Sequence, residues 1–264
     1  MADAPHPDMR AAAFVAARRE ARAAPVYPGA WPLSEAEAYA VQADAIALWP
    51  DSVAGWKVGL IQPPFAQQLG RSRLFGPVFA RHVVAAAAGP AVFPCIPNGF
   101  AAVEAEYVLK IGADVLPFEG WVPAQAADLV SAVHIGVELA GSPFPGINDH
   151  GPLVTISDFG NNAGLILGPE LEGGLAALED HRCAMWIDGV KIADGAAAGI
   201  PGGPLGSLVE LLNHNGRMGT MLPAGALVST GAATGVHQVR IGQQAVADFG
   251  ADGRIAVAMT EASA

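Results

Sequence analysis

Two glutamates, Glu104 and Glu106, stand one residue apart in the otherwise apolar run 103–109. Successive side chains of a β-strand point to opposite faces, so these two carboxylates face the same way between apolar neighbours. A third glutamate, Glu138, lies in a second strand-like run, 134–139. Carboxylates gathered among apolar residues repel one another unless a cation or a proton intervenes. The strands therefore either enclose an oxygen-ligand site for Mg²⁺ or Mn²⁺, or they present a solvated face with ordinary surface glutamates.

Composition excludes several classes of partner. The chain has 264 residues, of which 52% are hydrophobic and 15% charged, and this suits one large domain or a core with a smaller partner domain. Its formal charge of -11 argues against nucleic acid and against anionic membranes. A small anionic substrate remains compatible with this charge, because a bound metal reverses the local field.

Cysteine usage and hydropathy favour a cytoplasmic protein. Cys95 and Cys183 stand far apart and form no disulfide framework, and residues 1–7 lack the pattern of a signal peptide. The longest apolar stretch, near 83–93, is too short and too interrupted by glycine and proline to span a bilayer.

The order of the predicted elements indicates an α+β fold with an N-terminal helical segment. Asp8 and the Ser34-to-Glu37 capping box predict the starts of two helices. From about Val83 onward, short apolar runs predict mostly β structure. The predicted elements are helices at 8–24, 34–48, 123–133 and 205–215, a strand at 53–60, a loop at 61–79, and two hairpins turning at Asp188-Gly189 and Asp252-Gly253.

A few polar residues stand in settings that suit chemistry. Lys57 lies beside Trp56 in an apolar run, where burial would lower its pKa and suit it to proton transfer, or where its head would reach solvent past the tryptophan. The polar segment 155–164 either lines a site, with Asp158 as an acid or base, or forms an Asx-type turn. His134 shares a face with Glu138 and is either its partner or a half-buried histidine.

The chain resembles the 2-keto-4-pentenoate hydratase / 4-oxalocrotonate decarboxylase family of the fumarylacetoacetate hydrolase-like superfamily. The resemblance covers roughly residues 33–260 and depends on the order and spacing of many short motifs. They include Gly55-Trp56-Lys57-Val58-Gly59-Leu60, Phe75-Gly76-Pro77, Val103-Glu104-Ala105-Glu106, Val137-Glu138-Leu139, Ile156-Ser157-Asp158 through Asn162-Ala163-Gly164, Ser229-Thr230-Gly231 and Ala247-Asp248-Phe249-Gly250.

The resemblance implies a mixed β-roll core, with residues 1–80 as an N-terminal α/β cap region and residues 81–264 as the catalytic core. It implies that Mg²⁺ or Mn²⁺ is held by Glu104, Glu106 and Glu138, with Lys57 and Asp158 as catalytic residues. The expected contacts to the substrate are Asn162, Thr230 and Gly231.

The activity that the resemblance implies is addition of water to a short 2-hydroxy-2,4-dienoate in aromatic catabolism, giving a 4-hydroxy-2-oxoacid. The alternatives are decarboxylation of a 2-oxo-3-enedioate, or a non-catalytic paralogue that acts as a partner subunit. A homo-oligomer is expected, as is a complex with a related decarboxylase or an aldolase.

The chain departs from the family in front of the glutamate pair. Members often carry a proline and a basic residue there, whereas this chain has Ala101-Ala102. Loss of the basic residue would remove a contact to a carboxylate, which predicts a smaller or less charged substrate.

Overall fold

The computed structural model describes residues 6–264, so most of the segment 1–7, predicted to lack a signal peptide, lies outside the described residues. The helices, apart from short 3₁₀ turns, are α1 (Met9–Arg19), α2 (Glu35–Leu48), α3 (Phe65–Leu69), α4 (Pro123–Ala127), α5 (Pro152–Ser157), α6 (Gly174–Ala177) and α7 (Gly203–Met218). The strands are β1 (Val53–Leu60), β2 (Arg73–Phe79), β3 (Val83–Ala85), β4 (Ala91–Cys95), β5 (Phe100–Ile111), β6 (Val130–Ser142), β7 (Asn162–Glu170), β8 (Arg182–Ile187), β9 (Val190–Ala196), β10 (Leu227–Ser229), β11 (His237–Gln238), β12 (Gln244–Asp248) and β13 (Arg254–Glu261).

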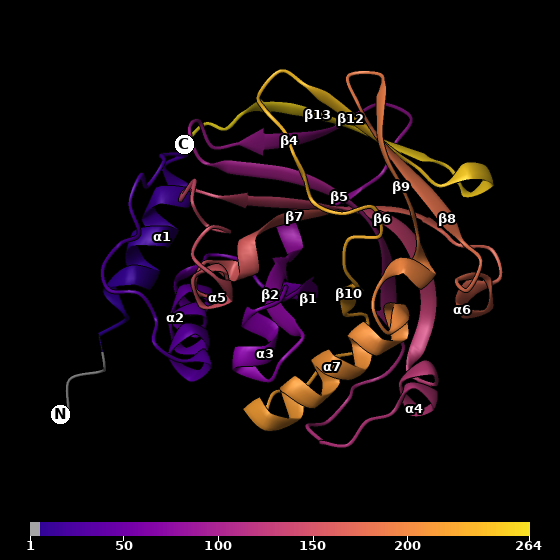
Figure 1. Ribbon diagram of the computed structural model, residues 1–264, viewed down its shortest axis with the longest axis horizontal. Coiled ribbons are helices and arrows are strands. Elements are labelled where there is room, and N and C mark those ends of the chain that lie inside the picture. The colour runs from indigo at the N-terminus through magenta and orange to yellow at the C-terminus, as the bar shows by residue number, and fades with distance from the viewer. Residues whose placement is uncertain (1–5) are drawn as a thin grey trace.

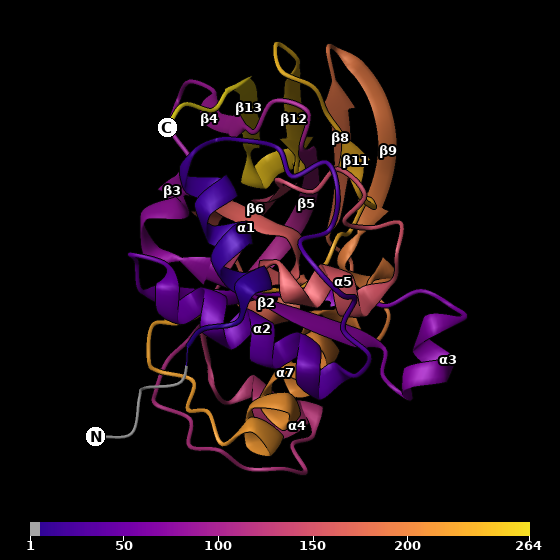
Figure 2. The same cartoon turned by 90° about the vertical axis from the view of Figure 1, so that its left-hand side faces the viewer.

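Two mixed sheets form the core of the molecule. The main sheet has the order β2-β1-β10-β5-β6-β7-β3, with β11 paired to β5, and the second has the order β4-β13-β12-β8-β9. Figure 1 shows the second sheet above the long strands β5 and β6, with α1 and α2 to the left and α7 below. Seen from that left side, α1 and α2 lie in front of the main sheet (Figure 2). The predicted α+β class with a curled mixed β core is confirmed.

Apolar side chains from both sheets fill the space between them. Tyr107 and Ile135 of the main sheet and Ile255 of the second sheet are all buried in one cluster. The main sheet includes β1 and β2, which come from residues 1–80, so it crosses the predicted boundary at residue 80. The division into a cap and a core stays a prediction.

Local signals located most of the predicted elements. Asp8 accepts a hydrogen bond from the Arg10 N–H at the start of α1, and Ser34 accepts one from the Glu37 N–H at the start of α2. The Asp188-Gly189 turn joins β8 to β9 as expected. None of the helices in residues 6–264 has both the length and the hydrophobicity that crossing a bilayer requires.

Three predicted elements were wrong where pairing with a distant strand competed with a local pattern. The predicted loop 61–79 contains α3 and β2, and β2 pairs with β1. The predicted helix 123–133 ends at Ala127, because Val130 onward pairs with β5. The connection from β12 to β13 is a longer turn that contains a 3₁₀ segment, rather than a two-residue Asp-Gly turn.

Candidate metal centre and active-site cavity

Three glutamates from β5 and β6 meet on one face of the main sheet. Glu104 lies directly opposite Glu138 in the antiparallel register, and Glu106 follows two residues later on the same face. One oxygen from each carboxylate lies within 4.8 Å of the other two. The relative exposures of Glu104, Glu106 and Glu138 are 5%, 0% and 1%, so the alternative of a solvated strand face is wrong.

The neighbouring strands β1 and β10 add polar side chains to this face. Lys57 and Ser229 are partners in the parallel β1–β10 register, and Ser229 pairs in turn with Val108 of β5. A Cβ atom at Gly55 would lie 2.1 Å from the carbonyl oxygen of Leu227. Glycine at this position therefore allows β1 to approach β10, and this approach sets Lys57 beside the glutamates.

One oxygen of Glu106 is held by β10 and the residues that follow it. Glu106 Oε2 accepts a hydrogen bond from the Ser229 hydroxyl and another, at 3.0 Å, from the Gly231 N–H. Its other oxygen, Oε1, is buried and has no hydrogen-bond partner in residues 6–264.

Glu138 shows the same division between its two oxygens. Its Oε1 accepts a hydrogen bond from Asn162 Nδ2 at 3.1 Å and lies 3.3 Å from Lys57 Nζ. Its Oε2 is buried without a partner among the described residues. Buried polar atoms are almost always paired, because leaving them unpaired costs free energy. Two unpaired carboxylate oxygens in one cluster therefore fit a hard divalent cation that would take both as ligands.

The three carboxylates and Lys57 change one another's proton affinity. Burial raises the pKa of Glu104 to about 8, helped by the charge of Glu138 and opposed by Lys57. Burial and the charges of Glu138 and Glu104 raise the pKa of Glu106 well above its usual range. Burial alone lowers the pKa of Lys57, but the three glutamates outweigh it and raise that pKa overall. The predicted lowering of the Lys57 pKa is therefore wrong, because three negative charges lie next to the amino group.

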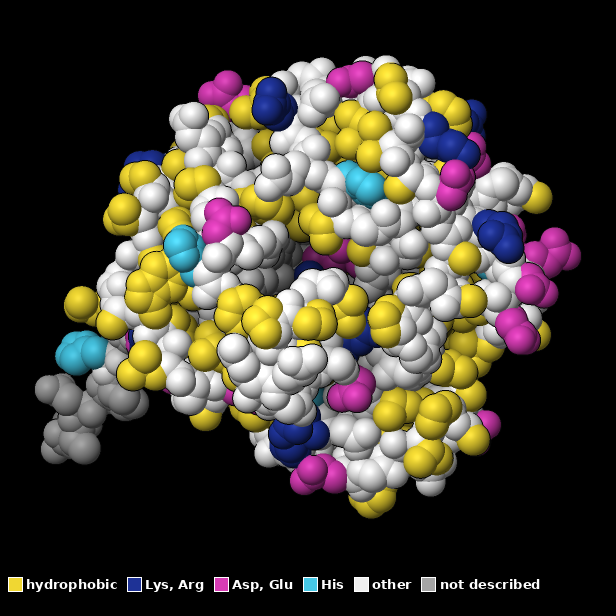
Figure 3. All heavy atoms as spheres, in the orientation of Figure 1, with side chains coloured by type: hydrophobic (Ala, Val, Ile, Leu, Met, Phe, Trp, Pro, Cys, Tyr) yellow, Lys and Arg dark blue, Asp and Glu magenta, His cyan; other side chains and the backbone are white. Residues whose placement is uncertain are grey.

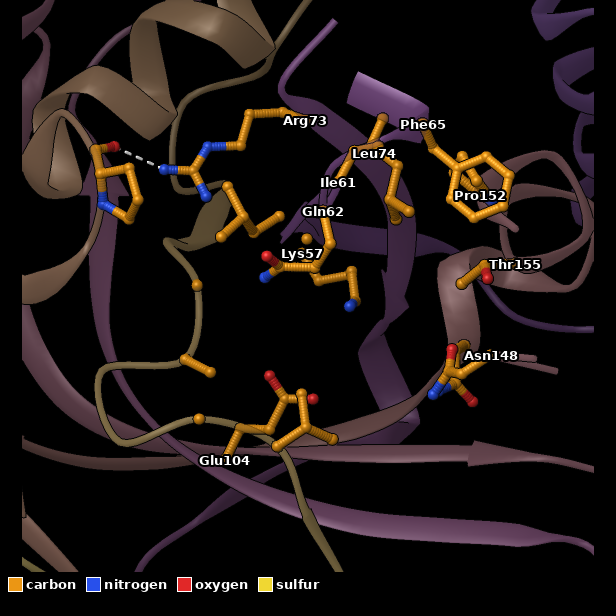
Figure 4. A pocket seen from close by; sticks show the side chains of 18 of the residues that line it. Lys57, Ile61, Gln62, Phe65, Arg73, Leu74, Glu104, Asn148, Pro152 and Thr155 are labelled. Atoms are coloured by element: carbon orange, nitrogen blue, oxygen red, sulfur yellow. Dashed lines mark hydrogen bonds between the residues drawn. The ribbon is translucent and has the colours of Figure 1, made fainter. Parts of the chain in front are cut away.

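Glu104 of this cluster and the neighbouring Lys57 lie in the wall of a cavity of about 500 Å³, which is the size of a small-molecule site. In Figure 4 the Lys57 amino group and the Glu104 carboxylate both point into this cavity, and Arg73 lies on the side away from Glu104. Apolar side chains, among them Ile61 and Leu74, form part of the wall. Figure 3 shows a hollow near the middle of the molecular face, with acidic and basic side chains visible inside it.

The structure places Asp158 elsewhere. Arg18 Nε lies 2.7 Å from Asp158 Oδ1, Arg18 Nη2 lies 2.9 Å from Oδ2, and the Ser142 hydroxyl also donates to Oδ2. Both oxygens are occupied, and Asp158 is not among the residues that line the cavity. The structure therefore does not bring Asp158 into the cavity that Lys57 and Glu104 line.

The predicted substrate contacts are divided in the same way. Gly231 lines the cavity, whereas Thr230 is buried outside it and its hydroxyl donates to the Tyr107 carbonyl oxygen at 2.7 Å. Asn162 holds Glu138 and is not part of the cavity wall. His134 is half-buried, and its Nδ1 lies 3.1 Å from the Gly168 carbonyl oxygen.

A scan against protein-family models and a search of curated proteins find no match. Solved structures do match. The 4-oxalocrotonate decarboxylase from Pseudomonas putida G7, complexed with magnesium and adipate, is 22% identical with a TM-score of 0.73, and the match covers 85% of each chain. The fumarylpyruvate hydrolase from Pseudomonas aeruginosa, in complex with Mn²⁺ and pyruvate, is 19% identical with a TM-score of 0.55, over 78% of this chain and 88% of that one. The 5-carboxymethyl-2-hydroxymuconate delta-isomerase from Mycobacterium smegmatis is 14% identical with a TM-score of 0.56, over 80% of this chain and 81% of that one.

The chain has the same fold as these enzymes. The fold that the sequence resemblance implied is thereby confirmed, although identities of this size do not carry a substrate or a reaction from one chain to another.

Sequence reasoning missed two polar residues of the site. Ser229 stands immediately before Thr230-Gly231 and was not singled out, although it shares its strand face with Lys57. Arg73 was missed because residues 61–79 were interpreted as a loop. The alternation of Arg73, Phe75 and Pro77 along β2 was too irregular a signal to identify a strand.

Proposed function

We propose that the protein is a divalent-metal-dependent lyase whose cation, Mg²⁺ or Mn²⁺, is held by Glu104, Glu106 and Glu138. The observation that carries this proposal is the pair of buried oxygens without partners, Glu106 Oε1 and Glu138 Oε2. The three neighbouring carboxylates provide further support, because a cation bound between them would relieve their mutual repulsion. Enzymes of the same fold have been crystallised with magnesium and with Mn²⁺.

The proposed reaction adds water to a short 2-hydroxy-2,4-dienoate of aromatic catabolism and yields a 4-hydroxy-2-oxoacid. When bound, a divalent cation supplies Lewis-acid stabilisation of the negative charge that develops on the substrate's 2-oxygen. The cavity has the volume for such an acid, and its apolar wall suits a hydrocarbon chain.

Lys57 is the proposed proton carrier, because its amino group points into the cavity beside the glutamates. The protonated Lys57 Nζ donates a proton to C5, and the neutral amine then takes up the proton that the substrate's 2-hydroxyl loses, so that Lys57 is protonated again. Water then adds its oxygen to C4 and a proton to C3 of the resulting 3-en-2-one. With the three carboxylates neutralised by a bound cation, the interaction that raises the Lys57 pKa would be lost. The amine could then take up and release protons.

We assign Asp158 a positioning role in place of proton transfer. Arg18, which binds both Asp158 oxygens, also donates from Nη1 to the Asn162 carbonyl oxygen at 3.2 Å. Asn162 in turn donates to Glu138. This series of contacts connects Asp158 to the cation site without bringing its carboxylate into the cavity.

Decarboxylation of a 2-oxo-3-enedioate is the second candidate reaction. It uses the same stabilisation of charge at the 2-oxygen, but CO₂ leaves where the hydratase adds water. The support for it is the 4-oxalocrotonate decarboxylase of the same fold, which was crystallised with a dicarboxylate, adipate. A cytoplasmic location, assembly into a homo-oligomer, and a complex with a decarboxylase or an aldolase stay predictions.

The proposal is tested with metal-stripped protein and 2-hydroxypenta-2,4-dienoate. Loss of dienol absorbance that appears only after Mg²⁺ or Mn²⁺ is added, with the hydrated product identified, is the expected result. A parallel assay follows CO₂ release from 4-oxalocrotonate, and release of CO₂ without hydration would make decarboxylation the function. Bound metal without turnover of either compound would contradict both reactions and favour the non-catalytic paralogue.

A further inference from the structure

Arg73 is a buried cation without an ionic partner among residues 6–264. It stands at the start of β2 and has a relative exposure of 4%. Its guanidinium makes one hydrogen bond, from Nη2 to the Pro201 carbonyl oxygen at 2.6 Å. Within residues 6–264, no carboxylate oxygen lies within 4.0 Å of it.

A guanidinium in this setting has spare binding capacity. It carries five N–H donors in a planar fork, and within the described part of the chain only one hydrogen bond is made. Removing a charge from water without pairing it is costly, so buried arginines normally face a carboxylate or a phosphate. Burial lowers the pKa of Arg73, and Glu210 and Glu106 offset part of that effect from a distance. An arginine nevertheless stays charged at neutral pH, because its ordinary pKa is so high.

The unpaired guanidinium is part of the cavity wall. Arg73 lines the same cavity as Lys57 and Glu104. In Figure 4 the guanidinium and the Glu104 carboxylate lie on opposite sides of the open space, with the Lys57 amino group between them in that view. A molecule with one end at the glutamates can therefore extend through the cavity toward Arg73.

Gly231 keeps the space beside Arg73 open. Its N–H donates to Glu106 at 3.0 Å, and a Cβ atom at this position would lie 3.7 Å from Arg73 Nη1. Its φ of +112° is in the region that glycine adopts without strain. Any larger residue would place side-chain atoms next to the guanidinium.

We propose that Arg73 binds the terminal carboxylate of the substrate, so that among 2-oxo and 2-hydroxy-dienoic acids the protein prefers dicarboxylates to monocarboxylates such as 2-hydroxypenta-2,4-dienoate. This inference rests on the proposed function, which places the 2-oxoacid end at the glutamates. The planar fork of Arg73 matches a carboxylate through two parallel hydrogen bonds. The sequence lacks a basic residue just before Glu104, and Arg73 supplies the missing positive charge from a different strand. This inference differs from the expectation of a less charged substrate, which stays a prediction.

The test compares acids that differ only at the end away from the 2-oxo group. The binding of 2-oxopentanoate and 2-oxopentanedioate, and of 2-oxohexanoate and 2-oxohexanedioate, is measured by calorimetry with Mg²⁺ present. The wild-type protein is expected to bind each dicarboxylate about 10- to 100-fold more tightly than its monocarboxylate partner, as a charged hydrogen-bonded pair predicts. Equal affinities within both pairs would overturn the inference.

Variants identify the residue responsible. Arg73→Met should abolish the preference for dicarboxylates and leave the affinity for the monocarboxylates within about threefold of wild type. Arg73→Lys should retain part of the preference, because it keeps the charge and loses the fork. The matched control is Arg71→Met, two residues away and outside the cavity wall, which should bind all four acids like wild type. If Arg73→Met weakens both classes equally, Arg73 holds the 2-oxoacid carboxylate and the inference is wrong.

Two further measurements separate this inference from the proposed function. Circular dichroism and a thermal melt establish whether each variant is folded. If Arg73→Met does not fold, the comparison uses Arg73→Lys in its place. A titration with Mg²⁺ alone reports whether the glutamates hold the cation. If they do not, the proposed function fails, and the dicarboxylate preference is then measured without metal, where only Arg73 supplies it. If Mg²⁺ binds but the preference is absent, the Arg73 inference alone fails.

Discussion

The glutamate cluster and the Asp158 site are both buried and acidic, but only one of them is complete. Each Asp158 oxygen has a partner, provided by Arg18 and Ser142. At the cluster, Glu106 and Glu138 each keep one buried oxygen without a partner, and the pKa of Glu106 is raised well above its usual range. A buried carboxylate with its own cation has its charge compensated within the fold, whereas carboxylates that share too little positive charge form a site for an added cation.

The largest expected effect is at the incomplete site. Glu106→Gln removes one ligand and is expected to lower Mg²⁺ affinity by more than about 100-fold, since even residues behind the ligands contribute about 10- to 100-fold. Metal-dependent turnover should disappear with it. The free energy of unfolding of the metal-free protein should change by less than about 1 kcal/mol, because a repelling carboxylate is lost with the ligand. Calorimetry and urea denaturation measure the two effects.

The matched control for that experiment is Glu172→Gln, on the exposed connection after β7. It should bind Mg²⁺ like wild type. Retention of metal-dependent activity in Glu106→Gln would contradict the assignment of the glutamates.

Lys57 distinguishes proton transfer from metal binding within the incomplete site. Lys57→Met should lower kcat by about 10²- to 10⁴-fold, the usual contribution of a positioned acid or base. Mg²⁺ affinity should be unchanged or higher, because a positive charge next to the cation is removed. Lys110→Met, at an exposed position of β5, is the control and should retain full activity. A kcat close to wild type in Lys57→Met would rule out the proposed proton carrier.

The complete site is tested through stability. Arg18→Met leaves the buried Asp158 carboxylate without its cation, and we expect a loss of about 3–5 kcal/mol in the free energy of unfolding. Mg²⁺ affinity of the folded variant should fall far less than in Glu106→Gln. Arg19→Met changes the adjacent exposed arginine and should unfold like wild type in a urea titration. If Arg18→Met proved as stable as Arg19→Met, the claim that Arg18 compensates the buried Asp158 carboxylate would be wrong.

A buried histidine supplies a smaller, pH-dependent effect that belongs to neither site. His214 packs against the rings of Tyr39 and Phe75, and burial, together with Arg217 and Arg71, lowers its pKa to about 4. Between pH 6.5 and about 4 the unfolded chain binds a proton that the folded protein excludes. Protonation of His214 in the unfolded chain therefore lowers the free energy of unfolding as the pH falls through that window, by about 3 kcal/mol at its acid end.

His214→Phe should remove this acid-side loss, and urea titrations at pH 7 and pH 4.5 compare it with wild type. His6→Phe, at an exposed position, should keep the wild-type loss. An unchanged loss in His214→Phe would show that other groups cause it.

Many features of this protein were predictable because they depend on neighbours in sequence. The alternation in a strand sets Glu104 and Glu106 on one face wherever that strand lies. The caps at Asp8 and Ser34 form with N–H groups two and three residues away. The many short motifs in order also predicted the superfamily fold.

Tertiary structure alone decided the rest, because the deciding contacts join residues far apart in the chain. Strand register set Glu138 opposite Glu104 and set Lys57 beside Ser229. The pKa of Lys57 rises because Glu104, Glu106 and Glu138 lie beside it. No local sequence pattern predicts that arrangement. Asp158 pairs with Arg18, 140 residues away in the chain, and its catalytic role stays a prediction. The sequence by itself determined which carboxylates share a face, and the long-range packing determined which of them are left in need of a cation.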